Sequence, residues 1–209
     1  MGTISTIDEM DLDGGVACLD FVNSGLGTHS GEVAERLHSY SDLLSLARRL
    51  GLLDRRLLVR LSDRAAAHPK EARNVLGQAL TARSAMTDIF GAIADKTTQQ
   101  LKKTSLSTFN EMIRAARSRQ EFVVGKGELR LTIAEPENIL TEPLDVFLLS
   151  AYGLLYDKPQ SLIKRCGRCQ WMFLDQTKSH RRKWCSMKDC GSIVKSGRYY
   201  ERKKHRSGA

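Results

Sequence analysis

The stretch CGRCQWMFLDQTKSHRRKWCSMKDC, residues 166–190, decides how the C-terminal part of this chain folds. It contains four of the five cysteines in the 209-residue sequence, at the spacing C-x2-C-x15-C-x4-C. Two cysteines separated by two residues share a tight turn that directs both sulfurs inward, and a second pair can complete a tetrahedral site for Zn²⁺. We therefore expect one structural zinc ion bound by Cys166, Cys169, Cys185 and Cys190.

Four thiolate ligands leave no coordination position open for water, so this zinc is predicted to be structural rather than catalytic. The alternatives are unpaired thiols or disulfides, and His180 is a candidate substitute ligand. A module this small has little core of its own, and zinc binding would supply most of its folding free energy. Removal of zinc is therefore expected to unfold residues 161–209 and to leave the rest of the chain folded.

The residues between the two cysteine pairs predict a short hairpin. WMFLD (171–175) and RRKWC (181–185) would be its strands, with a turn at 176–180. Ser186 can cap a following helix together with Asp189, which places Cys190 in the first helical turn. A cysteine turn, a hairpin and a helix that carries the last ligand describe a treble-clef-like zinc finger.

The basic excess of the chain lies beside these cysteines. Residues 161–209 contain 14 Lys and Arg against 3 Asp and Glu, a net charge of +11, whereas residues 1–160 contain 19 against 21, a net charge of −2. A basic end on a near-neutral body is typical of a segment that binds a polyanion. The alternative interpretations are a solvated basic surface and a surface that binds RNA or an acidic protein.

Two basic groups are candidates for phosphate contact. One precedes the third cysteine, and the other follows one face of the predicted C-terminal helix at spacings of three and four residues. The predicted nucleic-acid contacts are Arg181, Arg182, Lys183, Lys195, Arg198, Arg202, Lys203 and Arg206. Trp171 and Trp184 are predicted to lie in the small core of the finger rather than to stack on bases.

The first 158 residues predict a mainly helical body with one β-hairpin, an α+β fold. Apolar residues at helical spacing predict helices that start after Ser41 and Asp54, a long helix over 71–95, another around 106–116, and an apolar helix over 142–156 capped by Thr141. EFVVGKGELRLTIA (121–134) predicts the hairpin, and residues 1–30 are expected to be irregular. The predicted domains are 1–158 and 159–209.

The sequence resembles a known family at both ends. C-x2-C-x-W-x-F-L-D, then RRKWCSMxxCG and K-x-x-RYY-x-RKK, resemble the CGNR zinc finger, and GGVACLDFVNS (14–24) resembles the start of the ABATE domain of stress-induced bacterial transcription regulators. The resemblance implies a sensing or dimerising body joined to a DNA-binding finger. Ser192 and Ile193 stand where the family has Asn and Arg, so the contacts of those two residues are not carried over.

We therefore expect a zinc-finger DNA-binding transcription regulator that is cytoplasmic and associated with the nucleoid, and not an enzyme. Its body is expected to form a homodimer or to bind a small effector, with Asp20, Phe21 and Asn23 as the candidate pocket. A buried structural role is the alternative for these three residues. The longest apolar stretch, residues 143–156, is too short to span a bilayer and contains Asp145, so no membrane partner is expected.

Three other functions compete with this one. The first is a zinc-stabilised adaptor that binds RNA or protein. The second is a helix-turn-helix within residues 39–61, which is rich in arginine. The third is an enzyme with Cys18 as nucleophile and His29, His38 or His68 as base, although no phosphate loop, G-x-S-x-G or HExxH motif accompanies them.

Overall fold

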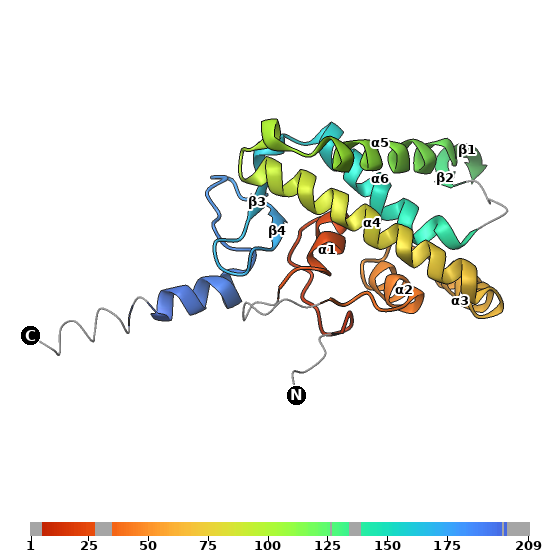
Figure 1. Ribbon diagram of the computed structural model, residues 1–209, viewed down its shortest axis with the longest axis horizontal. Coiled ribbons are helices and arrows are strands. Elements are labelled where there is room, and N and C mark those ends of the chain that lie inside the picture. Colours follow the sequence, from red (N-terminus) through yellow and green to blue (C-terminus); the bar gives the residue numbers. More distant parts are fainter. Residues whose placement is uncertain (1–5, 28–34, 126, 134–138, 198, 200–209) are drawn as a thin grey trace, which may run out of the picture.

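The computed structural model describes residues 6–27, 35–125, 127–133, 139–197 and 199. Figure 1 shows a helical body with the cysteine-rich segment at one end and a small hairpin at the other. The elements of the body are α1 (Ala17–Asn23), α2 (Tyr40–Arg49), α3 (Arg55–Ala67), α4 (Pro69–Ala94), α5 (Lys103–Ser118), β1 (Gln120–Gly125), β2 (Glu128–Ile133) and α6 (Glu142–Asp157). The cysteine-rich segment contains β3 (Ile163–Arg165), β4 (Met172–Leu174) and a π-helical turn, η4 (Met187–Gly191). The predicted mainly α, α+β class is confirmed.

Side-chain N-caps start two of the helices labelled α1 to α6, namely α2 and α3. The Asp54 carboxylate accepts a hydrogen bond from the Leu57 N–H at 2.8 Å at the start of α3, as predicted. The cap of α2 was predicted two residues too late: Ser39, not Ser41, forms a capping box with Asp42. Thr141 precedes α6, but its hydroxyl donates to the Asp145 carboxylate at 3.3 Å instead of capping the helix backbone.

The core of the body forms where α4, α5 and α6 pack together, with α1 inserted against α4 and α6 (Figure 1). The apolar helix α6 buries five large or medium side chains, and the rings of Phe147 and Phe21 stack with centroids 4.6 Å apart. Burial of this kind contributes about 1.5–3 kcal/mol for each large apolar side chain. The prediction that residues 1–30 are irregular was wrong at α1.

Helix α1 is short and has no side-chain N-cap, which explains why the sequence did not indicate it. Six of its seven residues are buried, from Cys18 to Asn23, so no polar face remains to give a helical period. A seven-residue helix is unstable in isolation, and its stability must come from packing. The tertiary structure, and not local propensity, therefore decides this element.

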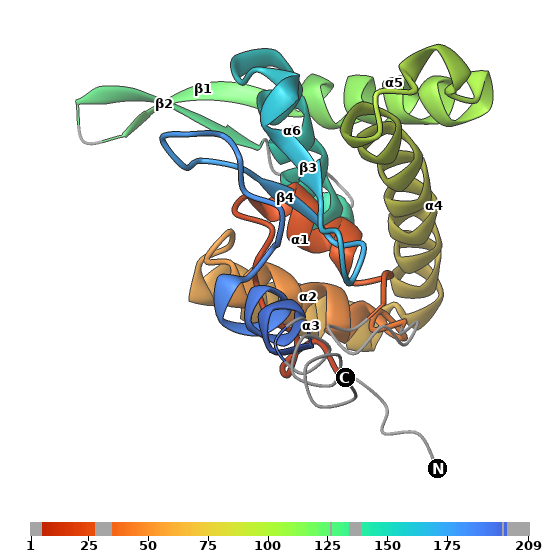
Figure 2. The same cartoon turned by 90° about the vertical axis from the view of Figure 1, so that its left-hand side faces the viewer.

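The predicted hairpin of the body is confirmed as β1 and β2. The two strands are antiparallel, and Phe122 pairs with Leu131 while Val124 pairs with Leu129. Gly127 in the connecting turn has φ of +82°, a conformation that side chains rarely adopt. Figure 2 shows this hairpin extending away from the helices.

The predicted hairpin within the finger was wrong. Strand β4 pairs with the upstream strand β3, with Ile163 opposite Leu174 and Arg165 opposite Met172, and residues 181–185 form no strand. The first cysteine pair lies in the connection between β3 and β4, residues 166–171. Asp175 then organises the downstream loop, because its carboxylate accepts hydrogen bonds from Thr177 and from the Arg182 N–H at 2.9 Å.

Strand β4 joins the finger to the body through its free edge. The Asn23 side chain of α1 accepts from the Met172 N–H at 2.8 Å and donates to the Met172 carbonyl at 2.9 Å. The Leu174 N–H donates to the Gly14 carbonyl at 2.9 Å. On the other strand, Arg165 forms a bidentate ion pair with Asp95, the residue that ends α4. One continuous core therefore runs across the linker at 157–159.

Replacing Asn23 by Ala should destabilise the whole chain. The change leaves the N–H and carbonyl of Met172 buried without these partners, which costs about 2–4 kcal/mol in unfolding free energy. Chemical denaturation of the zinc-loaded protein measures the effect. Asn74→Ala, at an exposed position on α4, is the matched control and should change stability by less than about 0.5 kcal/mol. Equal losses in the two variants would contradict the role given to Asn23.

Candidate metal centre and the surface around it

The four predicted ligands converge on one point. The ligand atoms of Cys166, Cys169, Cys185 and Cys190 all lie within 4.8 Å of one another, and all four residues are buried. The sulfurs of Cys169 and Cys185 are 3.5 Å apart, and those of Cys185 and Cys190 are 3.8 Å apart. With Zn–S distances of about 2.3 Å, a tetrahedral site has sulfurs separated by about 3.8 Å. The spacing fits one Zn²⁺ and is too long for disulfide bonds.

The first cysteine pair lies in a tight turn between β3 and β4. The Cys166 N–H donates to the Trp171 carbonyl at 2.8 Å, and the Gln170 N–H donates back to the Cys166 carbonyl at 3.2 Å. Gln170 adopts a left-handed conformation with φ of +67°. These bonds fold the chain back on itself and direct both sulfurs to the same side.

The second cysteine pair is held by a capped turn. The Ser186 hydroxyl accepts from the Asp189 N–H at 3.2 Å, which confirms Ser186 as the N-cap. The following π turn, η4, contains Cys190, and residues 192–197 continue as an α-helix. Cys190 therefore lies in the first helical turn, as predicted. His180 lies in the exposed loop and is not among the clustered ligands.

The Trp184 ring packs beside two glycines, each of which is next to a zinc ligand in the sequence. A Cβ atom on Gly167 would lie 2.9 Å from the Trp184 ring, and one on Gly191 would lie 3.3 Å from it. Both positions therefore favour glycine, because a side chain would push the indole away. Trp171 is fully buried, and its ring nitrogen donates to the Gly27 carbonyl. Both tryptophans belong to the core of the finger.

Hydrogen bonds with Cys169 and Cys185 lower the pKa of Cys166, whereas the pKa values of the other three clustered thiols are raised. Hydrogen bonds to the Cys166 and Cys169 side chains, together with burial, raise the pKa of Cys185 well above its usual range. Burial also raises the pKa of Cys190. A zinc ion reverses this effect, because the ion stabilises the thiolate form of each ligand. When bound, it would hold β3, β4 and the C-terminal helix together as a structural ion.

Comparison with known families agrees with this geometry. The ABATE family model, described as "Putative stress-induced transcription regulator", matches residues 15–156. The chain belongs to the ABATE family. The CGNR zinc-finger model matches residues 163–203, a range that contains all four ligands. A search of curated proteins found no match. The chain is thus a zinc-binding member of a family of regulators.

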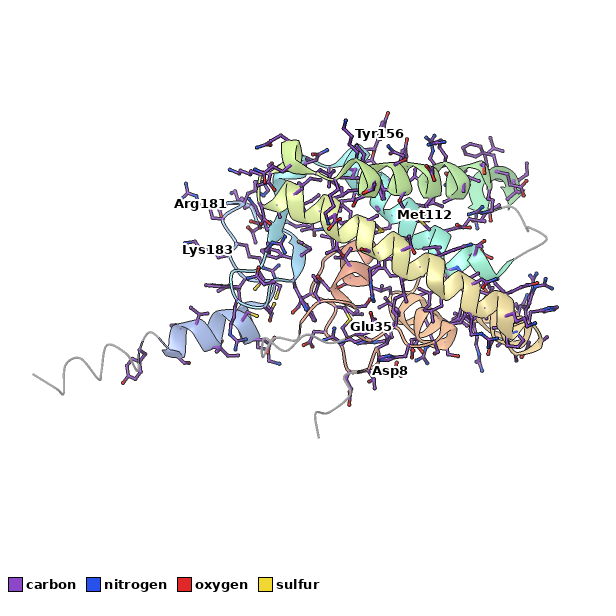
Figure 3. All side chains as sticks on the ribbon, in the orientation of Figure 1. Asp8, Glu35, Met112, Tyr156, Arg181 and Lys183 are labelled. Atoms are coloured by element: carbon purple, nitrogen blue, oxygen red, sulfur yellow. The ribbon has the colours of Figure 1, made fainter. Side chains whose placement is uncertain are left out.

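In this ABATE protein, only part of the predicted basic surface lies within the described residues. Arg181 and Lys183 are exposed on the outer side of the finger, away from the body (Figure 3). Arg182 lies between them but packs inward, with its guanidinium over the Phe173 ring at 5.0 Å and its Nε donating to the Trp184 carbonyl at 2.7 Å. Lys195 is exposed on the helix. The predicted contacts that lie outside the described residues are Arg198, Arg202, Lys203 and Arg206.

Ser192 and Ile193 replace the Asn and Arg of the family name at the start of this helix. The Ser192 hydroxyl donates to the Met187 carbonyl at 3.2 Å, so it secures the π turn locally. Ile193 is exposed on the helix surface. Neither residue supplies a positive charge at this point.

The residues predicted to line a ligand pocket lie in α1, and they hold this helix against the segments packed around it. Asp20 accepts from the Gly14 N–H at 2.8 Å, and burial raises the Asp20 pKa to about 7. Phe21 stacks on α6, and Asn23 binds β4. These contacts support the structural alternative, whereas a ligand role for Asp20, Phe21 and Asn23 stays a prediction.

Sequence reasoning missed Arg36, a buried arginine that connects the end of α1 to the finger. Its Nη1 donates to the carbonyls of Asn23, Ser24 and Leu26 at 3.0–3.4 Å, beyond the last turn of α1. Its guanidinium also lies 5.7 Å from the Trp171 ring centroid. A single arginine before α2 gives no sequence signal for this role, because burial depends on the packing of α1 against the finger.

The contacts of Cys18, Arg48 and Arg49 argue against two of the competing functions, the enzyme and the helix-turn-helix. Burial raises the pKa of Cys18 to about 12, so its thiol is protonated near neutral pH and is a poor nucleophile. Arg48 pairs with Asp8, and Arg49 donates to the Met10 carbonyl, so two of the five arginines in the predicted helix-turn-helix contact the N-terminal segment, whereas Arg55, Arg56 and Arg60 are exposed. No helix among the described residues is both long enough and apolar enough to cross a membrane.

Replacing Cys185 by Ser should abolish zinc binding and lower the stability of the body as well as the finger. Metal analysis should find one zinc per chain in the wild type and much less in the variant, and circular dichroism should show an earlier thermal transition. Cys18→Ala is the control, because this cysteine lies outside the cluster and should leave the zinc content unchanged. Full zinc content in Cys185→Ser would exclude the assigned site.

Proposed function

We propose that this ABATE protein is a DNA-binding transcription regulator whose zinc centre shapes a basic surface for the phosphate backbone. The observation that carries the proposal is the position of Arg181 and Lys183. Both are exposed on the loop that leads directly into the third zinc ligand, so the metal centre fixes where they point. The predicted contacts Arg198, Arg202, Lys203 and Arg206 lie outside the described residues and would add positive charge to this segment. Nucleoid association would follow from DNA binding.

The charge distribution supports a polyanionic partner. The segment 161–209 has a net charge of +11, whereas the rest of the chain is close to neutral. Lysine and arginine contacts to phosphates release counterions, which makes such binding strong at low salt and weak at high salt. Arginine side chains also form the commonest specific contacts to guanine in the major groove.

The connection between finger and body supports a regulatory role. Asn23, Arg36 and Asp95 each bind finger residues from a different part of the body. A shift of α1 or of the end of α4 would therefore move β3 and β4, and with them the metal centre. A signal received by the body can reach the DNA-binding surface through these direct contacts.

Replacing both Arg181 and Lys183 by Ala should weaken binding to duplexes enriched from a random pool by the zinc-loaded chain. Fluorescence anisotropy at several salt concentrations should show a slope of log K against log salt that is less steep by about 2, since each lost phosphate contact removes about 0.9. Zinc content and thermal stability should not change, because both side chains are exposed.

The matched control is Lys103→Ala with Arg114→Ala, which removes the same charge from exposed positions on α5. This variant should bind DNA like the wild type. Equal effects in the two double variants would contradict a localised binding surface. Enrichment of no duplex, with tight binding to RNA or to a protein instead, would favour the adaptor function.

The predicted small-molecule effector fits best in a cavity between α4, α5 and α6. This cavity of about 410 Å³ is lined by Met112, Leu144 and Leu148, with the ion pair between Arg119 and Asp145 in its wall. Its lining also includes Ala115 and the polar side chains of Gln78, Glu111 and Thr141, so it offers both apolar and polar contacts to a ligand. We assign effector binding here rather than to Asp20, Phe21 and Asn23, whose side chains already have partners within the protein.

Filling this cavity should abolish effector binding. A panel of single-ring aromatic acids and amines would be tested for stabilisation of the zinc-loaded protein by thermal shift. A compound that raises the melting temperature of the wild type should have no effect on Ala115→Trp, which blocks the cavity, and should still stabilise Ala66→Trp on the exposed surface of α3. Stabilisation that survives in Ala115→Trp would place the site elsewhere.

A further inference from the structure

The β1–β2 hairpin is amphipathic, and its apolar face is uncovered. Residues paired across an antiparallel ladder point to the same side of the sheet, and neighbours along each strand alternate. Phe122, Leu131, Val124 and Leu129 therefore share one face, through the pairs Phe122–Leu131 and Val124–Leu129. The other face carries Glu121, Val123 and Arg130, together with Glu128 and Thr132.

The exposure of the apolar face is high. Phe122, Val124, Leu129 and Leu131 are 70%, 78%, 71% and 54% exposed. Taking about 200 Å² for a complete large side chain, they leave roughly 500 Å² of apolar surface in contact with water. A patch of this size is at the upper end of what monomeric soluble proteins expose, and such patches usually mark interaction sites.

Within the described residues, the strands of the hairpin pack mainly against each other. The hairpin extends away from the helical body, and most of its residues are exposed (Figure 2). An isolated two-stranded hairpin is at best marginally stable in water, whereas additional strands over an apolar face stabilise it. A partner that covers this face would therefore stabilise the hairpin itself.

We propose that the apolar face of the β1–β2 hairpin binds the same face of a second copy of this chain and forms a two-fold symmetric dimer. Two such faces would bury about 1,000 Å² of apolar surface, which is the size at which specific protein interfaces begin. Face-to-face packing also gives each two-stranded hairpin an apolar layer to pack against, which an isolated hairpin lacks.

The charge of the hairpin favours a second copy over other partners. Residues 120–133 contain two acidic and two basic side chains, so the hairpin is neutral within a chain of net charge +9. None of the charged residues placed by the strand pairing lies on the apolar face. Two hairpins can meet there without electrostatic repulsion, and a nucleic acid or an anionic membrane would find no cationic surface.

This proposal goes beyond DNA binding, because two chains can associate through their hairpins whether or not the finger binds DNA. The hairpin and the metal centre lie at opposite ends of the body (Figure 1). A dimer formed through the hairpins leaves both fingers exposed. Two fingers related by a two-fold axis suit a DNA site with two half-sites.

Val123 and Val124 provide a matched test, because they are adjacent on one strand and point to opposite faces. Light scattering after size-exclusion chromatography, on the zinc-loaded full chain without DNA, should give twice the 23.4 kDa of one chain. Val124→Lys should weaken the dimer roughly 100-fold or more, since it replaces two buried apolar side chains with charges in each dimer. Val123→Lys should remain dimeric.

Leu129→Lys is the second variant, and it should behave like Val124→Lys. Unchanged zinc content in each variant would show that the body and the finger stay folded. A dimer that persists at 0.5 M salt supports an apolar interface. A monomeric wild type at concentrations of about 100 μM, a dimeric Val124→Lys, or equal dissociation of the Val123 and Val124 variants would each overturn the proposal.

Discussion

The convergence of four buried thiols within 4.8 Å is the constraint on which the arrangement of the finger depends. Two of them come from the turn between β3 and β4, and two from the capped turn that begins the last helix. These cysteines form no disulfides. A Zn²⁺ ion compensates the charge of the buried thiolates and fixes the relative positions of the hairpin, the basic loop and the helix.

The finger packs directly against the body. Strand β4 is paired with β3 on one edge and is bound on the other edge by the Asn23 side chain and the Gly14 carbonyl. Arg36 connects the end of α1 to Trp171. The apolar residues of the finger and those of the body form one core. Loss of zinc should therefore reach α1 and α4, rather than stop at residue 161 as the sequence suggested.

The two ends of the body have opposite surface chemistry. The finger end presents exposed basic side chains such as Arg181 and Lys183, whereas the hairpin end presents exposed apolar side chains on a neutral element. Basic surfaces bind through salt-sensitive phosphate contacts, and apolar surfaces bind through the loss of water-exposed area. Helix α5 leads directly into β1, and the cavity between α4, α5 and α6 lies beside the root of the hairpin at Arg119.

The sequence alone determined the elements that rest on local chemistry. The cysteine spacing identified the zinc ligands, Ser186 and Asp54 identified helix starts, and apolar periodicity identified the long helices and the β1–β2 hairpin. Only the tertiary structure decided α1, the strand that pairs with β4, and the roles of Asn23 and Arg36. Each of these depends on contacts between residues that are distant in sequence. The side chains of residues 18–23 and of Arg36 are buried, and β3 is only three residues long, so neither periodicity nor capping leaves a local signal.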